Sequence, residues 1–391
     1  MAARGEKEEA DRKATAQREL DAQLTGLVDL SHTIHSHPEV AFEEERAAAW
    51  VGESLAAGGF DVESGVCDLP TALIATAGSG PMVVGVCAEY DALPGIGHAC
   101  GHNVIAASAV GAGLALAPLA DDLGITVKVI GTPAEEGGGG KIYMLERGAF
   151  AGVDAAMMVH PGPAELIQMP CLAVSHFDVH YTGREAHASA FPEAGINAAD
   201  ALTVSQVGIG LLRQQFRSQD QVHGIVTKGG DAPNVIPART SAKYYVRAAT
   251  LEDLKTLEAR VRRCFEAGAL ATGTELEFDQ RSPRYSEFVP HPGMQARYRH
   301  NAEALGRTFP EVPEKVMMAS TDMANVSLAV PSIHPMLDID SLPAVNHQPE
   351  FAAAAITPTA DRAVRDGALA MAWTIIDLAT DDALRSELAA G

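Results

Sequence analysis

Apolar and polar positions follow two different patterns along the chain, and the change between them falls near residue 176. Before that point, short apolar runs rich in β-branched residues alternate with segments of helical periodicity. We expect strands at 71–77, 82–90, 125–131 and 154–160, and helices within 20–58, at 104–117 and from residue 140. This alternation is typical of an α/β fold, in which helices cover both faces of a mostly parallel sheet.

The second pattern, in residues 176–285, is strand, helix, strand, strand, helix, strand. That order predicts a ferredoxin-like α+β domain, and its length lies in the usual range for a domain. Beyond it we expect one more strand at 330–339 and an apolar helix from about Thr359. The sequence therefore predicts a first domain built from residues 1–175 and 286–391, with residues 176–285 inserted into it.

Composition fits this two-domain interpretation and points to a compartment. The chain has 391 residues, of which 47% are hydrophobic, enough for more than one core. Its first twenty residues carry both charge signs and lack the apolar segment of a secretory signal, so we expect a frayed start that leads into a helix. Five scattered cysteines do not form a disulfide framework, which favours a reducing cytoplasm.

Net charge argues against two classes of partner. At −22, the chain would repel the phosphate backbone of a nucleic acid and an anionic membrane surface. We expect no apolar run to reach the roughly 18 to 20 uncharged residues that a membrane span requires. Neither a nucleic acid nor a membrane is therefore expected as partner, and a carboxylate-bearing substrate would need a local basic group.

Metal-binding side chains follow the ends of the predicted strands. In open α/β sheets, ligands bind at the carboxyl ends of the strands, so these side chains should converge on one edge. A mixed set of thiolate, imidazole and carboxylate is typical of a catalytic metal site rather than a structural one. A single histidine at a strand end is more often structural, so the prediction depends on the combination. The set comprises Glu89, Asp91, Cys100, His102, Glu135, Glu136 and His160.

Two details of this set bear on its chemistry. The adjacent pair Glu135 and Glu136 can divide the work, one coordinating metal and the other taking a proton from metal-activated water, and we expect their side chains to diverge. The predicted helix after Cys100 should place its positive end near that thiol and favour the thiolate.

Motifs for other chemistries fail on inspection. The glycines at 137–140 lack the first glycine and the hydroxyl of a phosphate-binding loop, and "GAGLALA" lies inside a predicted helix without a preceding strand. No G-x-S-x-G elbow and no paired-cysteine deaminase signature occur. Two rival functions remain: a protein that binds acyl amino acids without cleaving them, and a redox protein that uses Cys100, although no resolving cysteine lies near it.

Five spaced motifs resemble one enzyme family over nearly the whole chain, from about Glu39 to the C-terminal helix. They are "EYDALPGIGHACGHN", "TPAEEGG", "VHPGP", "GREAHAS" and "NVIPA". The family is that of dinuclear-metal aminoacylases and carboxypeptidases, in its amidohydrolase branch of hippurate, indole-acetyl-amino-acid and aminobenzoyl-glutamate hydrolases. The chain departs from much of the branch at Asn103, where aspartate is common, and aminobenzoyl-glutamate-like members are the most similar.

The resemblance implies a hydrolase of an amide bond in N-acyl amino acids, dipeptide-like substrates or aryl amides of the aminobenzoyl-glutamate type. It implies two divalent cations, with zinc or manganese favoured and cobalt or nickel open. Glu135 corresponds to the general base for attack by a metal-bridged water, and Asp91 to the aspartate that orients a liganding group. The implied metal ligands are Cys100, His102, Glu136, His160 and His347.

The resemblance also assigns roles in the inserted domain, which corresponds to a lid and dimerisation domain. His187 matches a histidine that reaches the site of a neighbouring subunit and stabilises the oxyanion. From the residues alone, His187 is more simply an exposed surface side chain. Asn234 and Arg247 match residues that hold the carbonyl and the free carboxylate of the substrate, for which a planar guanidinium is suited. A homodimer is therefore expected.

Overall fold

The computed structural model describes residues 2–310 and 318–389, with side chains from residue 7 onward. The chain separates into two compact units. Unit 2 comprises Cys171–Glu287 and Ala319–Thr321, whereas the sequence pattern predicts an insertion at 176–285. Unit 1 contains the remaining segments, Met1–Pro170, Phe288–Met318 and Asp322–Gly391.

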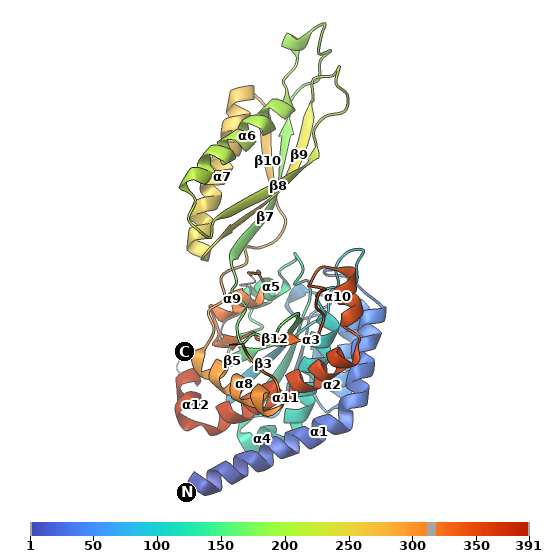
Figure 1. The fold of residues 1–391 in the computed structure, drawn as a ribbon, viewed down its shortest axis with the longest axis vertical. Coiled ribbons are helices and arrows are strands. Elements are labelled where there is room, and N and C mark those ends of the chain that lie inside the picture. Colours follow the sequence, from blue (N-terminus) through green and yellow to red (C-terminus); the bar gives the residue numbers. More distant parts are fainter. Residues whose placement is uncertain (1, 311–317, 390–391) are drawn as a thin grey trace. The chain divides into compact units, whose positions relative to one another are not determined.

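Unit 1 is built on a six-stranded sheet of order β1-β2-β4-β3-β5-β11 (Figure 1). Its three pairings β4–β3, β3–β5 and β5–β11 are parallel, and β1 and β2 add antiparallel strands at one edge. A separate parallel pair joins β6 to β12. The mostly parallel α/β sheet is therefore confirmed. Its strands are β1 (Asp61–Ser64), β2 (Leu73–Ala77), β3 (Met82–Glu89), β4 (Ile125–Thr132), β5 (Ala155–Met157), β6 (His160–Gly162), β11 (Ser332–Ile333) and β12 (Met336–Asp338).

Helices pack on this sheet through one continuous apolar core. The central helix α3 (His102–Leu116) packs on strand β3 and against the long helices α1 (Ala2–Ser36) and α11 (Pro358–Thr380). The other helices of unit 1 are α2 (Glu45–Ala57), α4 (Ala120–Leu123), α5 (Gly140–Glu146), α8 (Pro292–Ala304), α9 (Met323–Ser327), α10 (Pro349–Ala354) and α12 (Asp382–Ala389). Short 3₁₀ turns occupy Val66–Asp68 and Ala117–Leu119.

We expect no run to be apolar and long enough to cross a membrane. This expectation was wrong, because one helix meets the criteria of length and composition. Helical residues His102–Leu123 meet both criteria, but 78% of the 18-residue apolar window within them is buried inside the protein. Apart from Leu114, every residue of α3 is buried. A helix that is enclosed by a sheet and other helices needs apolar side chains all round, which accounts for its composition.

Three further expectations differ from the structure. Residues 2–19 are helical rather than frayed, because Ala16 and Leu20 of α1 join the core. The predicted strand at 330–339 is two strands, β11 and β12, which pair in different sheets. The predicted strand at 154–160 divides in the same way into β5 and β6. The break after β5 lets the chain leave the main sheet just before it reaches His160.

Unit 2 is a four-stranded antiparallel sheet of order β10-β7-β9-β8 with two helices packed on it, α6 and α7. The predicted strand and helix order is confirmed, and Phe177, Tyr244 and Phe265 lie in its core. Both helices begin at a side-chain cap, Asn197 for α6 and Thr250 for α7. The elements are β7 (Ala173–Thr182), α6 (Ala198–Leu212), β8 (Gln221–Lys228), β9 (Arg239–Ala248), α7 (Leu251–Thr272) and β10 (Glu275–Gln280), with 3₁₀ turns at Pro192–Ala194 and Arg213–Gln215.

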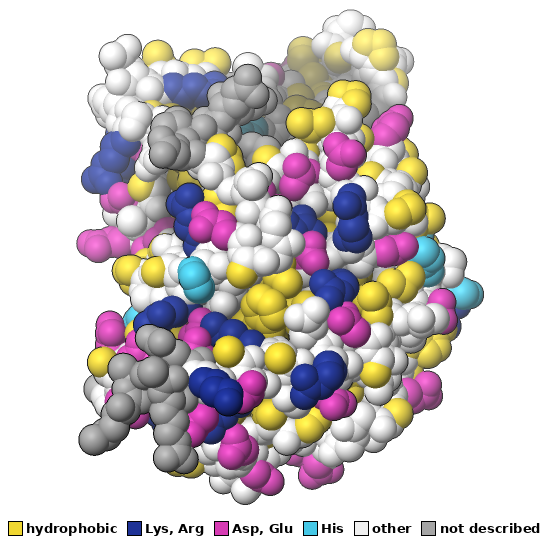
Figure 2. Space-filling view, turned by 60° about the horizontal axis from the view of Figure 1, so that its bottom comes forward, with side chains coloured by type: hydrophobic (Ala, Val, Ile, Leu, Met, Phe, Trp, Pro, Cys, Tyr) yellow, Lys and Arg dark blue, Asp and Glu magenta, His cyan; other side chains and the backbone are white. Residues whose placement is uncertain are grey.

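Charges of both signs are interspersed on the surface despite the net charge of −22. On the face drawn in Figure 2, Lys and Arg side chains lie among Asp and Glu side chains rather than in a separate basic patch. Exposed ion pairs such as Arg297–Asp381 and Arg365–Asp21 join neighbouring helices. Pairs of this kind contribute roughly 0 to 1 kcal/mol each, so the fold depends mainly on its cores.

Candidate metal centre

Three strand ends deliver the candidate side chains to one edge of the sheet in unit 1. Strand β3 ends at Glu89, β4 is followed by the loop that carries Glu135 and Glu136, and His160 begins β6. Between β3 and α3, Gly101 adopts φ +74°, and a Cβ at this position would lie 2.5 Å from Pro161 Cγ. A glycine is therefore required for the close turn that joins Cys100 to His102.

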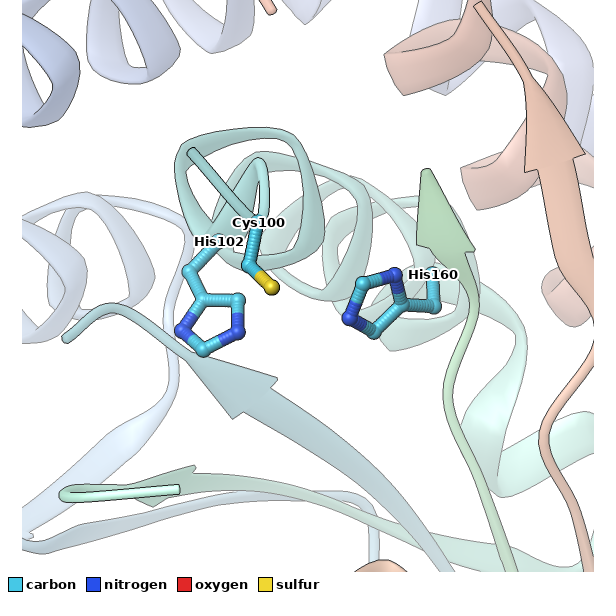
Figure 3. Close-up of side chains that lie close together, drawn as sticks. All are labelled: Cys100, His102 and His160. Atoms are coloured by element: carbon cyan, nitrogen blue, oxygen red, sulfur yellow. The ribbon is translucent and has the colours of Figure 1, made fainter. Parts of the chain in front are cut away.

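Cys100, His102 and His160 form a first cluster, in which one ligand atom of each lies within 4.8 Å of the others (Figure 3). His102 Nδ1 donates a hydrogen bond to Asp91 Oδ1 at 3.0 Å. His160 Nδ1 donates to the carbonyl of Pro161 at 2.8 Å. With both Nδ1 atoms engaged, each imidazole offers its Nε2 atom to a cation, the usual arrangement of a metal-binding histidine.

Cys100, Glu136 and His347 form a second cluster by the same 4.8 Å criterion. His347 comes from the loop before α10, and its backbone N–H donates to the carbonyl of Ala99 at 2.9 Å, which places it beside Cys100. His347 adopts φ +69°, a strained conformation for a residue with a side chain. The two clusters share Cys100, so its sulfur lies between two potential cation positions.

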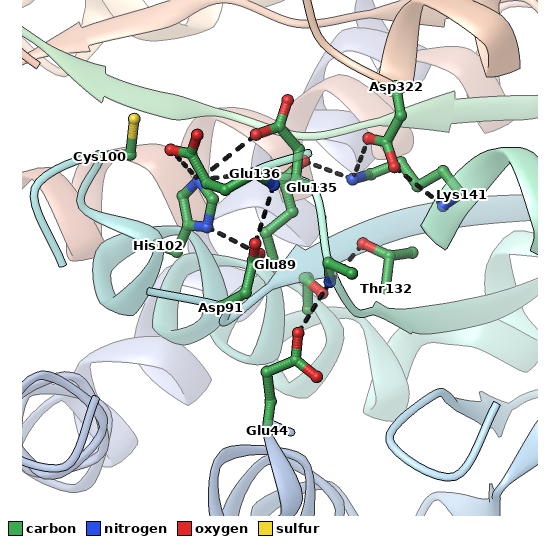
Figure 4. Close-up of polar contacts among 12 residues, drawn as sticks. Glu44, Glu89, Asp91, Cys100, His102, Thr132, Glu135, Glu136, Lys141 and Asp322 are labelled. Carbon is green, nitrogen blue, oxygen red and sulfur yellow. Dashed lines mark hydrogen bonds and ion pairs between the residues drawn. The ribbon is translucent and has the colours of Figure 1, made fainter. Parts of the chain in front are cut away.

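Glu135 and Glu136 do not diverge as expected. One oxygen of each lies within 4.8 Å of the other and of His102 Nε2, so both carboxylates point toward the same centre (Figure 4). Their partners differ instead. Glu136 Oε1 is 3.5 Å from His347 Nε2, and the Glu136 backbone N–H donates to Asp91 Oδ2 at 2.9 Å. Glu135 Oε2 is 4.0 Å from His102 Nε2.

The close packing of carboxylates sets the electrostatics of the centre. Burial, and then the charges of Glu89 and Glu136, raise the pKa of Glu135 well above its ordinary value. Burial alone would raise the pKa of Glu136, but the imidazoles of His347 and His102 hold it below its ordinary value. Burial alone would lower the pKa of His102, but Asp91 outweighs burial and raises that pKa to about 10.

In the chain by itself, burial and neighbouring carboxylates outweigh the helix end that we expect to favour the Cys100 thiolate. Burial, and then the negative charge of Glu136, raise the pKa of the Cys100 thiol well above its ordinary value. The helix dipole contributes only partial charge, whereas the carboxylates carry whole charges. Cations among these groups would reverse the balance, because a thiol that coordinates a metal is deprotonated.

The donor set fits divalent cations. Glu89 Oε2, His102 Nε2 and Glu136 Oε1 are buried without a hydrogen-bond partner within the part of the chain that the structure describes. Buried polar atoms without partners are destabilising. Thiolate, imidazole and carboxylate donors converge on the same space, and cations there would satisfy His102 Nε2 and Glu136 Oε1.

Two further charged residues, which the sequence does not mark as part of a site, lie beside this centre. Lys141 is fully buried in α5, and its ammonium pairs with Glu89 at 2.5 Å and with Asp322 at 2.7 Å (Figure 4). The backbone N–H of Lys141 also donates to Asp322 Oδ2 at 2.9 Å. Lys141 could have been noticed as a charge in an apolar helical segment. Asp322 precedes a helix of five residues and gives no signal in the sequence.

The three candidates of unit 2 lie at two places in that unit. His187 and Asn234 are exposed and lie close together, since His187 forms a β-bridge with Val235. Arg247 lies near the other end of β9, where its guanidinium donates to Ser320 Oγ at 2.7 Å. Strand β9 separates the two places by roughly 26 Å, from eight residues at about 3.3 Å each.

Comparison with known proteins agrees with the fold and the donor set. A model of peptidase family M20/M25/M40 matches residues 85–364. The chain is 36% identical to an Xaa-Arg dipeptidase of Mus musculus over 95% of this chain and 90% of the relative. It is 33% identical to a p-aminobenzoyl-glutamate hydrolase chain of Escherichia coli (strain K12) over 68% of this chain and 60% of the relative.

Solved structures share the fold over almost the full length. A dinuclear metal binding peptidase from the M20 family of Bacillus subtilis superposes with a TM-score of 0.63 at 22% identity, covering 90% of this chain and 98% of the other. The predicted family is confirmed. The chain belongs to peptidase family M20/M25/M40 and is a metal-dependent hydrolase of amide bonds.

Proposed function

We propose that this enzyme hydrolyses the amide bond of a small substrate that has a free carboxylate beside the scissile bond, such as a dipeptide or an N-acyl amino acid. The observation that carries the proposal is the pair of ligand clusters that share Cys100, with Glu135 directed at the same centre. The named relatives agree with this substrate class, because an Xaa-Arg dipeptide and p-aminobenzoyl-glutamate both carry a carboxylate next to an amide.

The two clusters would hold two divalent cations. Cys100, His102 and His160 would hold one, and Cys100, Glu136 and His347 the other. When bound, such cations supply Lewis-acid polarisation of the scissile carbonyl and of a water. The thiolate favours zinc, whereas the imidazoles and the carboxylate also suit manganese, cobalt or nickel.

Glu135 is the residue that we assign to proton transfer. Its carboxylate lies beside the ligand clusters but belongs to neither of the two that share Cys100. It would take a proton from the attacking water and deliver it to the leaving amine, as a general base and then a general acid. Asp91 holds His102 and the backbone of Glu136 with its two oxygens, and so orients one ligand from each cluster.

Arg247 is the residue that we assign to the substrate carboxylate. Its guanidinium is partly buried, and among the described residues no carboxylate pairs with it. Burial holds the pKa of Arg247 below its ordinary value, but a guanidinium stays charged in proteins. A partly buried cation with only a hydroxyl partner is suited to receive an anion, and its planar fork matches a carboxylate.

The separation of His187 and Asn234 from Arg247 supports a site shared between two copies of the chain. A dipeptide is far shorter than the roughly 26 Å between these places, given about 3.3 to 3.6 Å per residue. We therefore propose that one copy supplies Arg247 while its partner supplies His187, which would stabilise the oxyanion, and Asn234, which would hold the carbonyl.

Unit 2 has a surface suited to forming this homodimer. Among the strands that the structure describes, β8 pairs only with β9, so its other edge is open to a further strand. Apolar side chains are exposed on β8 and on α6, with Ile225 at 64% and Leu211 at 73%. Exposed apolar surface next to an open strand edge favours association.

The five cysteines are all reduced thiols in the structure, which supports our proposal of a cytoplasmic location.

The rivals differ from this proposal in measurable ways. A non-catalytic binding protein would need neither Glu135 nor the polar centre around it, and a redox protein would need a second cysteine near Cys100. Among the described residues, no other cysteine joins the clusters. Chelation should therefore abolish turnover, and a thiol-blocking reagent should leave the metal-loaded enzyme active because the sulfur is engaged.

The decisive test is Glu135→Gln, assayed for amine release from a panel of dipeptides, N-acyl amino acids and aryl amides. We expect kcat to fall by roughly 10²-fold or more, while metal content measured by mass spectrometry stays at the wild-type level. Glu165→Gln is a matched control, because Glu165 is also a buried carboxylate in unit 1 but pairs with Arg307. Full activity of Glu135→Gln would remove the assignment.

A further inference from the structure

Glu44 is a buried carboxylate whose position no metal cluster explains. It precedes α2 and is completely buried, and none of the described Lys or Arg side chains pairs with it. Three neutral donors hold it instead. The backbone N–H groups of Phe42 and Ala134 donate to Oε1 at 3.0 and 2.9 Å, and Thr71 Oγ1 donates to Oε2 at 2.9 Å. Burying a carboxylate without a cation is unfavourable, so its retention calls for a reason.

Ala134, one of these donors, is the residue immediately before Glu135. It is completely buried and adopts φ +59°, a conformation that residues with side chains rarely take. Phe42 also has positive φ, at +65°, so a single oxygen atom of Glu44 holds two of the six described non-glycine residues of this kind. Such strain persists only where surrounding contacts determine the conformation.

Two backbone N–H groups in the first half of the turn from Pro133 to Gly139 are thus held by carboxylates. Glu44 holds the N–H of Ala134, and Asp91 holds the N–H of Glu136. The carbonyl of Ala134 accepts from Gly138 and Gly139 at 3.1 and 2.7 Å, which closes the turn. Glu135 lies between the two held N–H groups, so its direction depends on both.

We propose that Glu44 is a positioning residue that fixes the Ala134 backbone and thereby aims the Glu135 carboxylate at the metal centre. The inference rests on the proposed function of Glu135. Glu44 does not touch the substrate or the reacting atoms, and it acts only through the backbone of the turn. A displacement of about 1 Å in a catalytic group can lower turnover by about 100-fold.

Three variants separate positioning from general stability. Glu44→Ala removes both oxygens. Glu44→Gln keeps one acceptor oxygen for the two N–H groups, and its amide group can donate to Thr71 Oγ1. Thr71→Val removes only the bond to Oε2 and leaves the Ala134 bond in place, which makes it the matched control.

The readouts are hydrogen–deuterium exchange of the peptide covering residues 133–140, kcat, and the melting temperature, all on the metal-loaded full chain. For Glu44→Ala we expect faster exchange in this peptide and a kcat that is about 10- to 100-fold lower. Thr71→Val should lower the melting temperature by a few degrees and leave exchange and kcat within about twofold of wild type. Glu44→Gln should stay within about threefold.

Unchanged exchange at 133–140 in Glu44→Ala would overturn the proposal, and so would an equal increase in Thr71→Val. If Glu44→Ala does not fold, Glu44→Asp replaces it, because aspartate keeps the charge but is one methylene too short to hold Ala134. Exchange does not depend on turnover. If wild-type protein cleaves no amide, that result counts against the proposed function, while the exchange measurement still decides the role of Glu44.

Discussion

The two units hold their candidate side chains in opposite ways. In unit 1, most of the polar centre is buried, and the candidate histidine ligands are fixed by the hydrogen bonds that they donate to Asp91, Ala99 and Pro161. In unit 2, His187 and Asn234 are exposed, and His187 Nδ1 accepts from the backbone N–H groups of Ser189 and Ala190 in its own turn, at 3.3 and 3.2 Å. The difference teaches that the candidate metal centre is preorganised within one chain, whereas the residues that we assign to the substrate would, in our proposal, act together with a second copy.

The largest effect should come from disturbing the preorganised centre. Asp91→Asn keeps the size of the side chain but removes the charge that holds His102 Nδ1–H and the N–H of Glu136. We expect a loss of about 10- to 100-fold in metal affinity or activity, as is usual for groups that orient metal ligands. Competitive titration with a zinc chelator measures the affinity. Wild-type affinity together with wild-type kcat would show that Asp91 orients nothing.

Arg247 tests the other side of the comparison. Arg247→Ala should raise KM about 10-fold or more, because a charge-assisted hydrogen bond contributes roughly 1.5 to 3 kcal/mol, and kcat should change less. Arg247→Lys should recover only part of the affinity, since an ammonium lacks the planar fork. A substrate amide without a carboxylate provides the control. If its KM rises as much, Arg247 does not bind the carboxylate.

Mixing of two variant chains tests whether the exposed residues act across copies. His187→Ala and Glu135→Gln chains should each be nearly inactive, but a mixed dimer has one site that combines intact Glu135 with intact His187. Equal random mixing should therefore restore about a quarter of wild-type activity. Exchange of chains between dimers can be confirmed with differently tagged chains. Exchange without recovered activity would place His187 and Glu135 in the same copy or outside the reaction.

The smallest effect should come from the surface of unit 1. Arg297→Ala removes an exposed ion pair with Asp381 that lies between α8 and α12. We expect a change within about 0.5 kcal/mol in unfolding free energy and unchanged kinetics. Urea denaturation measures the first quantity. A loss above about 2 kcal/mol would show that the fold depends on surface charge more than its apolar core indicates.

Much of the architecture was predictable because its signals are local. Strands β3 and β4 and helix α3 are long apolar runs, and the liganding residues follow strand ends, where open α/β sheets place them. Strand β1 has the sequence "DVES", which carries no alternation, so only its pairing with β2 reveals it. The N-terminal helix was missed because charged residues of both signs dominate its sequence, while only a few apolar side chains, among them Ala16 and Leu20, join the core.

The parts of the site that escaped prediction depend on long-range contacts. Glu44 accepts a hydrogen bond from the N–H of Ala134, which lies 90 residues further along the chain, and Lys141 pairs with Asp322, 181 residues away. No spacing rule connects residues so far apart. Even the local prediction that Glu135 and Glu136 diverge was wrong, because the turn is held by carboxylates from elsewhere in the chain. Sequence patterns and the family resemblance indicated the candidate ligands, and tertiary contacts determine how these side chains are oriented.

The most direct test of the central claim is anomalous diffraction from crystals of the zinc-loaded enzyme at the zinc absorption edge. We predict two peaks on opposite sides of Cys100 Sγ, one shared with His102 and His160 and one shared with Glu136 and His347. A single peak, or peaks remote from that sulfur, would contradict a two-cation centre that shares one thiolate.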